Sequence, residues 1–227
     1  MRGMIITLLG GGSWLALGVP AIAQSPRPTV SAPAYTQSAR RNAEMLRQYT
    51  WTMRVVLTAD EKQQPPQLYL MRFDPSGKLQ KTPITVQKQK TYRGFLGKKK
   101  KKKADEMKQY LSGLSDLVKN YTAPTPDQMA HFFTRAQYAP QPNGTVKVAG
   151  TNFLQQGDSV SYAVNQATKQ PVLLSFSTEL DSDRVTGTVQ YEQVPKGPRY
   201  AAQTMVSVPT RKLHLQVDTF DYAPKQP

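Results

Sequence analysis

Apolar and polar residues alternate along most of this 227-residue chain. In the segment 49–57, YTWTMRVVL, every second side chain from Tyr49 to Leu57 is apolar. A period of two is typical of a strand that buries one of its faces. The same signal predicts further strands at 67–73, 78–84, 145–150, 158–164, 171–180, 184–194, 200–208 and 212–220.

Short turn-forming segments separate these strands. They include Asp74 to Gly77, Asn143-Gly144 and Asp181 to Asp183, and the last of these is interpreted as a hairpin turn. Short links between half-buried strands favour an antiparallel meander with one dry and one wet face. The predicted fold class is therefore α+β: a curved antiparallel sheet, an unclosed β-barrel, with helices covering its concave face.

The helices of this cover are predicted in the middle of the chain. From Met107, apolar residues recur at spacings of four and three, which indicates an amphipathic helix of about five turns that ends before Pro124. The segment 126–136, PDQMAHFFTRA, predicts a second, short helix. Another helix, at 38–47, leads into the first strand. The two central helices would lie across the dry face like a lid.

The N-terminal residues are typical of a secretory signal peptide. Arg2 precedes an apolar stretch from Met4 to Val19, Pro20 interrupts it, and Ala21 and Ala23 form a small-residue cleavage site. The stretch is shorter than the ~20 residues that a membrane span needs. We expect a signal peptide at 1–23, a flexible leader at 24–35, one domain at 36–222 and a tail at 223–227. The mature protein is then soluble in the periplasm or secreted.

The composition narrows the class of partner. The chain has no cysteine and a formal net charge of +15. An exported protein without disulfides depends on its apolar core, and a strongly basic one is expected to meet anionic partners. Export removes nucleic acid from the expected partners. Anionic lipid, acidic polymers of the cell surface and acidic proteins remain.

Few residues suit catalysis or metal binding. Of the two histidines, His214 is expected to face solvent and His131 to lie at the surface or partly buried in the packing, and no serine lies in a nucleophile elbow. Zinc is disfavoured because the chain has so few nitrogen and sulfur ligands, and Asp181 to Asp183 offers too few oxygens for calcium. The sequence predicts a binding protein, not an enzyme, with no metal and no cofactor.

Positive charge is concentrated in one segment. Residues 75–104 carry eleven basic side chains and no acidic one. Six of them are consecutive lysines placed before the predicted helix, where the helix dipole disfavours cations. The run is either an exposed loop without a role or a contact to an anionic surface, into which the neighbouring apolar pair would dip. The residues of this predicted surface are Arg93, Phe95, Leu96, Lys98, Lys99, Lys100, Lys101, Lys102 and Lys103.

The order of these parts resembles the LolA/LolB-like fold of periplasmic lipoprotein carriers. The segments YTWTMRV, FDPSGKLQKTPI, KKKKKKADEMKQYL, GDSVSYAVNQATKQPV and PKGPRYAAQTMVSVPTRKLHL are similar to those of an uncharacterised family of exported bacterial proteins. The resemblance covers Ser38 to Tyr222. It implies an unclosed barrel covered by helices, with an apolar cavity for acyl chains.

Two interpretations follow. In the first, the protein is a monomeric carrier or sensor that binds lipid or an acylated ligand in an apolar cavity and docks to anionic membranes. In the alternative, it is an interaction or structural protein of the envelope with a filled core, whose basic segment binds an acidic polymer or protein. The residues expected to line the cavity are Trp51, Met53, Val55, Met107, Leu111, Leu114, Phe176, Tyr191 and Leu215.

Overall fold

The computed structural model of the chain describes residues 31–84 and 94–225. Its helices are α1 Ala32–Leu46, α2 Gly94–Thr122, α3 Pro126–Arg135 and a 3₁₀ turn, η1 Pro209–Arg211. Its strands are β1 Tyr49–Ala59, β2 Lys62–Gln63, β3 Gln67–Phe73, β4 Leu79–Pro83, β5 Gln137–Pro140, β6 Thr145–Thr151, β7 Ser159–Asn165, β8 Pro171–Leu180, β9 Asp183–Gln193, β10 Arg199–Val208 and β11 Leu213–Pro224.

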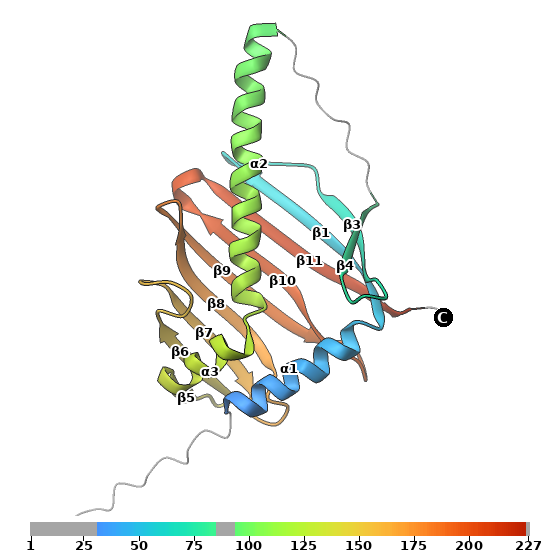
Figure 1. The fold of residues 1–227 in the computed structure, drawn as a ribbon, viewed down its shortest axis with the longest axis vertical. Coiled ribbons are helices and arrows are strands. Elements are labelled where there is room, and N and C mark those ends of the chain that lie inside the picture. Colours follow the sequence, from blue (N-terminus) through green and yellow to red (C-terminus); the bar gives the residue numbers. More distant parts are fainter. Residues whose placement is uncertain (1–30, 85–93, 226–227) are drawn as a thin grey trace, which may run out of the picture.

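The strands form one antiparallel sheet in the order β4-β3-β1-β11-β10-β9-β8-β7-β6-β5, with β2 paired to β1. The outer strands β4 and β5 are not paired with each other, so the sheet is not closed. The predicted α+β class with an unclosed antiparallel sheet is confirmed. Because the chain leaves one edge at β4 and returns at the opposite edge through β5, the segment between them has to cross the sheet. Figure 1 shows α2 and α3 on one face of it, with α1 beside α3 and below the end of α2.

All nine predicted strands are present, and two short ones were missed. β2 has two residues, too few for a periodic pattern. β5 is the polar segment QYAP at the outer edge of the sheet, where a proline is tolerated because its missing N–H has no ladder partner to lose. The hairpin turn at Asp181 is also confirmed. Asp181 and Ser182 both have positive φ, 50° and 68°, between the paired residues Leu180 and Asp183.

The predicted start of α2 is wrong. The sequence places it near Met107 with the lysines in front, whereas the helix begins at Gly94 and contains all six lysines. Lysine is a good helix former, and the unfavourable dipole acts mainly in the first turn. Lys102 and Glu106 lie one turn apart, with 3.9 Å between Nζ and Oε1. α1 likewise begins at Ala32, before the predicted residue 38, because Pro33 suits a first helical turn.

The limits of α3 follow from its own residues. The Thr125 side chain accepts a hydrogen bond from the Gln128 backbone N–H at 3.2 Å, and the Gln128 side chain accepts one from the Thr125 backbone N–H at 2.7 Å. This capping box satisfies two N–H groups that would otherwise lack a partner, and Pro126 follows in the first turn. The cap fixes the N-terminal end of α3, and the aromatic residues of the helix face the sheet.

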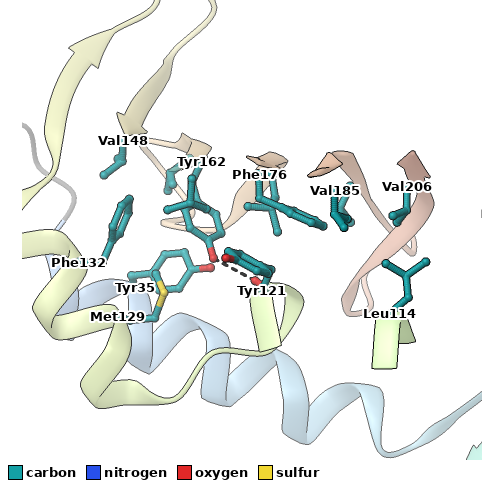
Figure 2. Close-up of a cluster of buried hydrophobic side chains, with 14 of the residues drawn as sticks. Tyr35, Leu114, Tyr121, Met129, Phe132, Val148, Tyr162, Phe176, Val185 and Val206 are labelled. Atoms are coloured by element: carbon teal, nitrogen blue, oxygen red, sulfur yellow. Dashed lines mark hydrogen bonds between the residues drawn. The ribbon is translucent and has the colours of Figure 1, made fainter. Parts of the chain in front are cut away.

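The core lies between the helices and the middle of the sheet (Figure 2). Leu114 and Tyr121 of α2 are completely buried, and the Tyr121 ring stacks on Phe176 of β8 with 4.5 Å between centroids. Phe176 in turn covers Gly187 of β9, where a Cβ would come within 2.2 Å of the ring. On the other side of this pair, α3 and α1 supply the remaining aromatic contacts. The labelled members are Tyr35, Leu114, Tyr121, Met129, Phe132, Val148, Tyr162, Phe176, Val185 and Val206.

One buried carboxylate joins α2 to the loop after β6. Asp158 is 1% exposed and accepts hydrogen bonds from the Tyr121 hydroxyl at 2.6 Å and from the backbone N–H groups of Phe153, Leu154 and Gln155 at 2.6, 2.8 and 3.1 Å. A buried polar group is tolerated when it is hydrogen-bonded. Asp158 therefore orders this loop and fixes the C-terminal end of α2.

Candidate functional site

The residues predicted to line one cavity are divided between three places. Leu114 and Phe176 are buried in the core beneath α2. Four more are partly buried and pack against that same core: Met107, Leu111, Tyr191 and Leu215. All six therefore belong to, or pack against, one hydrophobic core cluster. The structure therefore brings six of the nine predicted residues together.

Trp51 lies in a separate aromatic cluster where β1, β3 and β11 meet. Its ring stacks on Tyr222 with 5.4 Å between centroids and 9° between planes, and it lies 5.7 Å from Phe73. Tyr200 extends the cluster, 4.1 Å from Tyr222. Trp51 is 6% exposed, so little of its surface is free for a ligand.

Met53 and Val55 belong to an apolar strip beside the core. Met53 pairs with Tyr69 of β3, and Val55 pairs with Val217 of β11. Side chains of directly paired residues lie on the same face of a sheet, and so do side chains two residues apart on one strand. Met53 and Val55 therefore lie on the same face as Leu57, which packs on the core. We call Met53, Val55, Tyr69 and Val217 the helix-side strip. All four are only partly buried.

The helices pack beside this strip and do not cover it. α2 packs on β8, α1 on β10 and α3 on β6, whereas the strip is on β1, β3 and β11. In Figure 1 β11 and the end of β1 pass behind α2, most of the length of β1, β3 and β11 lies to its right, and the N-terminal part of α2 extends beyond the sheet. The border of the strip is polar at one point, since Lys81 Nζ lies 3.8 Å above the Tyr69 ring. Burial lowers the pKa of Lys81.

The predicted anionic-surface residues lie on the projecting half of α2 or before it. Lys101, Lys102 and Lys103 are exposed. Arg93 lies outside the described residues, as do the side chains of Phe95, Leu96, Lys98, Lys99 and Lys100. The backbone positions of the last five are helical, so the exposed loop considered for the lysine run is replaced by the first turns of α2.

The sequence pattern missed two hollows. The second lies mainly on the face of the sheet away from the helices, and the first is lined both by that face and by Phe132, Arg135 and Ala136 at the end of α3. Their volumes are about 610 and 720 Å³, and both are lined by Ser175 and Phe176. Serine and threonine at the wet positions of β7, β8 and β9 are the signal that could have indicated them, because short side chains leave room on a sheet. Arg54 and His214 line the second hollow, and Lys147 lines the first.

Arg54 is held in place by a buried carboxylate. Its Nη2 and Nε donate to Asp218 Oδ2 at 2.8 and 3.0 Å, and Gln203 and Gln216 donate to the same carboxylate at 3.1 and 2.9 Å. Burial raises the pKa of Asp218, but the hydrogen bonds from Gln216, Gln203 and Arg54 together outweigh it and leave the pKa below its ordinary value. Asp218 is therefore ionised at neutral pH, and it orients Arg54 at the edge of the hollow.

Comparison with known proteins gives distant structural neighbours. No protein-family model matches the chain, and no curated protein matches its sequence. A LolA superfamily protein from Nitrosomonas europaea is similar in structure, with a TM-score of 0.40 and 11% identity, covering 87% of this chain and 95% of that one. A putative outer membrane lipoprotein-sorting protein domain from Vibrio parahaemolyticus has a TM-score of 0.40 and 9% identity, covering 86% and 92%.

A DUF1329 family protein from Desulfovibrio piger has a TM-score of 0.38 and 7% identity, covering 86% of this chain and 93% of its own. The neighbours thus include the LolA superfamily that the sequence resembles. Since the TM-scores are low, the fold is assigned from the strand order and register given above. Within residues 31–84 and 94–225, no helix is long and apolar enough to cross a membrane. The same residues contain no cluster of three histidine or acidic side chains suited to a metal ion.

Proposed function

We propose that this chain is an exported binding protein of the bacterial envelope. It holds a lipid or an acylated ligand against the helix-side strip and approaches anionic surfaces through the lysines of α2. The observation that carries the proposal is the strip itself, formed by Met53, Val55, Tyr69 and Val217. It continues the apolar face of the core beyond the area that the helices cover.

An acyl chain suits this strip for a simple reason. Burial of apolar surface contributes about 25 cal/mol per Å², and the strip offers that surface next to residues that are already packed. At the border between core and strip, Leu215 lies two residues from Val217 on β11. Met107, Leu111 and Tyr191 pack against the same core. A ligand lying along this border would contact the residues predicted for the cavity without requiring Leu114 or Phe176 to move.

The lysines of α2 would favour anionic ligands and anionic membranes. A lysine near an anionic bilayer contributes on the order of 1 kcal/mol, and Lys101 to Lys103 are exposed on the part of α2 that extends beyond the sheet. We extend this surface to Lys98, Lys99, Lys100 and Arg93. Phe95 and Leu96 are proposed to add apolar contact with the membrane.

Localisation and oligomeric state are part of the proposal. A signal peptide at 1–23 would direct a monomeric, soluble domain to the periplasm or beyond it. The neighbour from Vibrio parahaemolyticus is described as a lipoprotein-sorting protein domain, and a similar role here would place the protein among binding proteins and not enzymes.

The second candidate is an envelope interaction protein with a filled core. It is favoured by the complete burial of Leu114, Tyr121 and Leu174, since none of these three side chains has surface open to a ligand. In that case the basic segment binds an acidic polymer or protein, and the helix-side strip has no ligand.

Native mass spectrometry of the purified protein, combined with displacement of an apolar fluorescent probe by fatty acid, tests the lipid proposal. We expect co-purifying lipid and saturable probe binding. Met53→Gln and Val55→Thr, which nearly keep side-chain shape, should weaken binding. The matched control Val56→Thr, the next residue of β1 on the other face, should not. Absence of lipid together with equal probe binding by all variants would favour the filled-core candidate.

Sedimentation with vesicles tests the lysine surface separately. Wild-type protein should sediment with vesicles rich in phosphatidylglycerol at low salt and be released as salt rises, because exposed charges are screened. Replacement of Lys98 to Lys103 by glutamine should remove most of this binding with little change in thermal stability. Equal sedimentation of the two proteins would show that these lysines have no docking role.

A further inference from the structure

The face of the sheet away from the helices has a floor of short hydroxyl side chains. Ser161, Ser175 and Thr188 are paired in succession across β7, β8 and β9, and Ala149 precedes them on β6. The row continues through Met205, Gln216 and Val56 on β10, β11 and β1. A second row runs beside it: Thr151, Ser159, Ser177, Thr186, Ser207, His214 and Thr58.

These rows are hollowed and not flat. The two hollows of about 610 and 720 Å³ lie over them and share Ser175. Neighbouring strands are about 4.8 Å apart, so the five gaps from β6 to β11 span roughly 24 Å. We call this depression, defined by the lining of the two hollows, the hydroxyl groove. It is long enough for several units of a polymer and too wide for a single small metabolite.

The ionisable side chains that line the groove are all basic. Arg135 and Lys147 line the hollow at the β6 end, and Arg54 and His214 line the hollow at the β11 end. No aspartate or glutamate lines either hollow among the described residues. Two carboxylates lie beside the rows on this face: Asp218, which is buried and hydrogen-bonded to Arg54, and Glu179, which is two residues beyond Ser177 on β8 and is paired in register with Arg184. Because Nη1 of Arg54 makes no hydrogen bond to Asp218, this guanidinium keeps a donor for a ligand.

We propose that the hydroxyl groove binds an extended acidic polysaccharide. Serine and threonine hydroxyls both donate and accept hydrogen bonds, as sugar hydroxyls do, and the basic residues at the two ends would pair with the carboxylate groups of the polymer. An acyl chain is a poor match, since Met205 and Val56 are the main aliphatic side chains of the two rows. An acidic peptide that added a strand would need a free sheet edge, and the groove lies across the middle of the sheet.

Binding of fluorescent alginate oligosaccharide to the folded protein, measured by anisotropy, tests this site. Ser175→Tyr fills the point where the two hollows meet, and Arg135→Gln with Lys147→Gln removes the charge at one end. Each variant should raise the Kd about tenfold, the equivalent of about 1.4 kcal/mol. The controls are Ser112→Tyr on the exposed surface of α2 and Lys119→Gln with Lys196→Gln, and their Kd should match that of wild type.

Two comparison ligands and one further variant make the outcome decisive. Neutral dextran should not bind, and polyglutamate should bind more weakly than alginate. The glutamine replacement of Lys98 to Lys103 should leave alginate affinity within about twofold if the groove is the site. Loss of binding only in that six-lysine variant, or equal affinities of the groove variants and wild type, would overturn the proposal. Thermal unfolding of each variant confirms that it is folded. The hydroxyl groove and the proposed lipid site are formed by different residues, so one proposal can be contradicted while the other stands.

Discussion

The guanidinium of Arg211 lies 3.8 Å from the centre of the Tyr110 ring and so connects η1 to the middle of α2. Arg211 is itself fixed by Asp183, which also accepts a hydrogen bond from the Thr210 hydroxyl at 2.6 Å. Hydrogen bonds from Thr210 and Arg211 lower the pKa of Asp183, so this carboxylate is ionised at neutral pH. The contact is near the point where α2 passes the end of the sheet, and it holds the helix against β9.

Replacing Arg211 by alanine should loosen α2. A cation–π contact of a partly exposed arginine is worth about 0.5–2 kcal/mol, and we expect the free energy of unfolding to fall by an amount in that range. Hydrogen exchange of the amides around Tyr110 should accelerate more than that of the central strands. Arg41→Ala, an exposed arginine of α1, is the control and should change neither quantity. Unchanged exchange in Arg211→Ala would mean that core packing alone holds α2.

Gly187→Ala should destabilise the protein. The new Cβ would lie 2.2 Å from the tip of the Phe176 ring, and Tyr121, stacked on the face of that ring, restricts its movement. Overpacking of this kind costs about 1–3 kcal/mol, measurable by urea unfolding.

Gly113→Ala is the matched control. At that position the nearest atoms are those of Leu180 at 3.8 and 3.9 Å, an ordinary contact, and the residue is within α2. Alanine should therefore raise stability by about 0.5–1 kcal/mol through its better helix propensity. A Gly187→Ala protein as stable as wild type would contradict the packing described for Phe176.

Asp158→Ala should be among the most damaging single substitutions. It leaves three backbone N–H groups and the Tyr121 hydroxyl without their acceptor, and each unsatisfied buried donor costs about 1–3 kcal/mol. Calorimetry should show a loss of several kcal/mol or a failure to fold. Asp116→Ala, an exposed aspartate on α2, should be close to neutral. A small effect at Asp158 would mean that the loop after β6 is ordered by other contacts.

Asp218→Asn should make stability less sensitive to acid. The folded pKa of Asp218 lies below its ordinary value, so its ionised form stabilises the protein above the unfolded pKa of about 3.9, and that contribution is lost as pH falls through the folded pKa. We expect a loss of about 1–3 kcal/mol at pH 7 that shrinks below pH 4. Urea unfolding across this pH range measures it. A loss that does not change with pH would assign the effect to packing.

The hydrophobic pattern predicted the strands well because it is local. Alternation along Tyr49 to Leu57, or along the segment 171–180, depends only on which residues neighbour one another in the chain. The structure has the buried and exposed faces that this alternation predicts. Leu174 and Phe176 are buried, while Ser175 and Ser177 face the opposite side. The hairpin at Asp181 is equally local, since its two residues with positive φ complete a short loop.

The site was predicted less well, since a shared face does not mean a shared neighbourhood. Trp51 and Phe176 both lie on apolar sides of their strands, yet Trp51 packs with Phe73 and Tyr222 while Phe176 packs with Tyr121. The hydroxyl groove was missed because hydroxyls at wet positions are expected of any solvated strand. Only pairing in register turns Ser161, Ser175 and Thr188 into one continuous row.

The sequence by itself determined the strands, the core faces and the antiparallel class, since each follows from local periodicity and turn residues. Tertiary structure decided that β1 pairs with β11, because that contact joins residues more than 150 positions apart. The entropic cost of closing so long a loop is offset only when the whole sheet forms. The tertiary structure also decided where α2 begins, and so its length. Helix growth is cooperative, so a packed segment around Leu114 and Tyr121 supports turns that continue back through the lysines to Gly94.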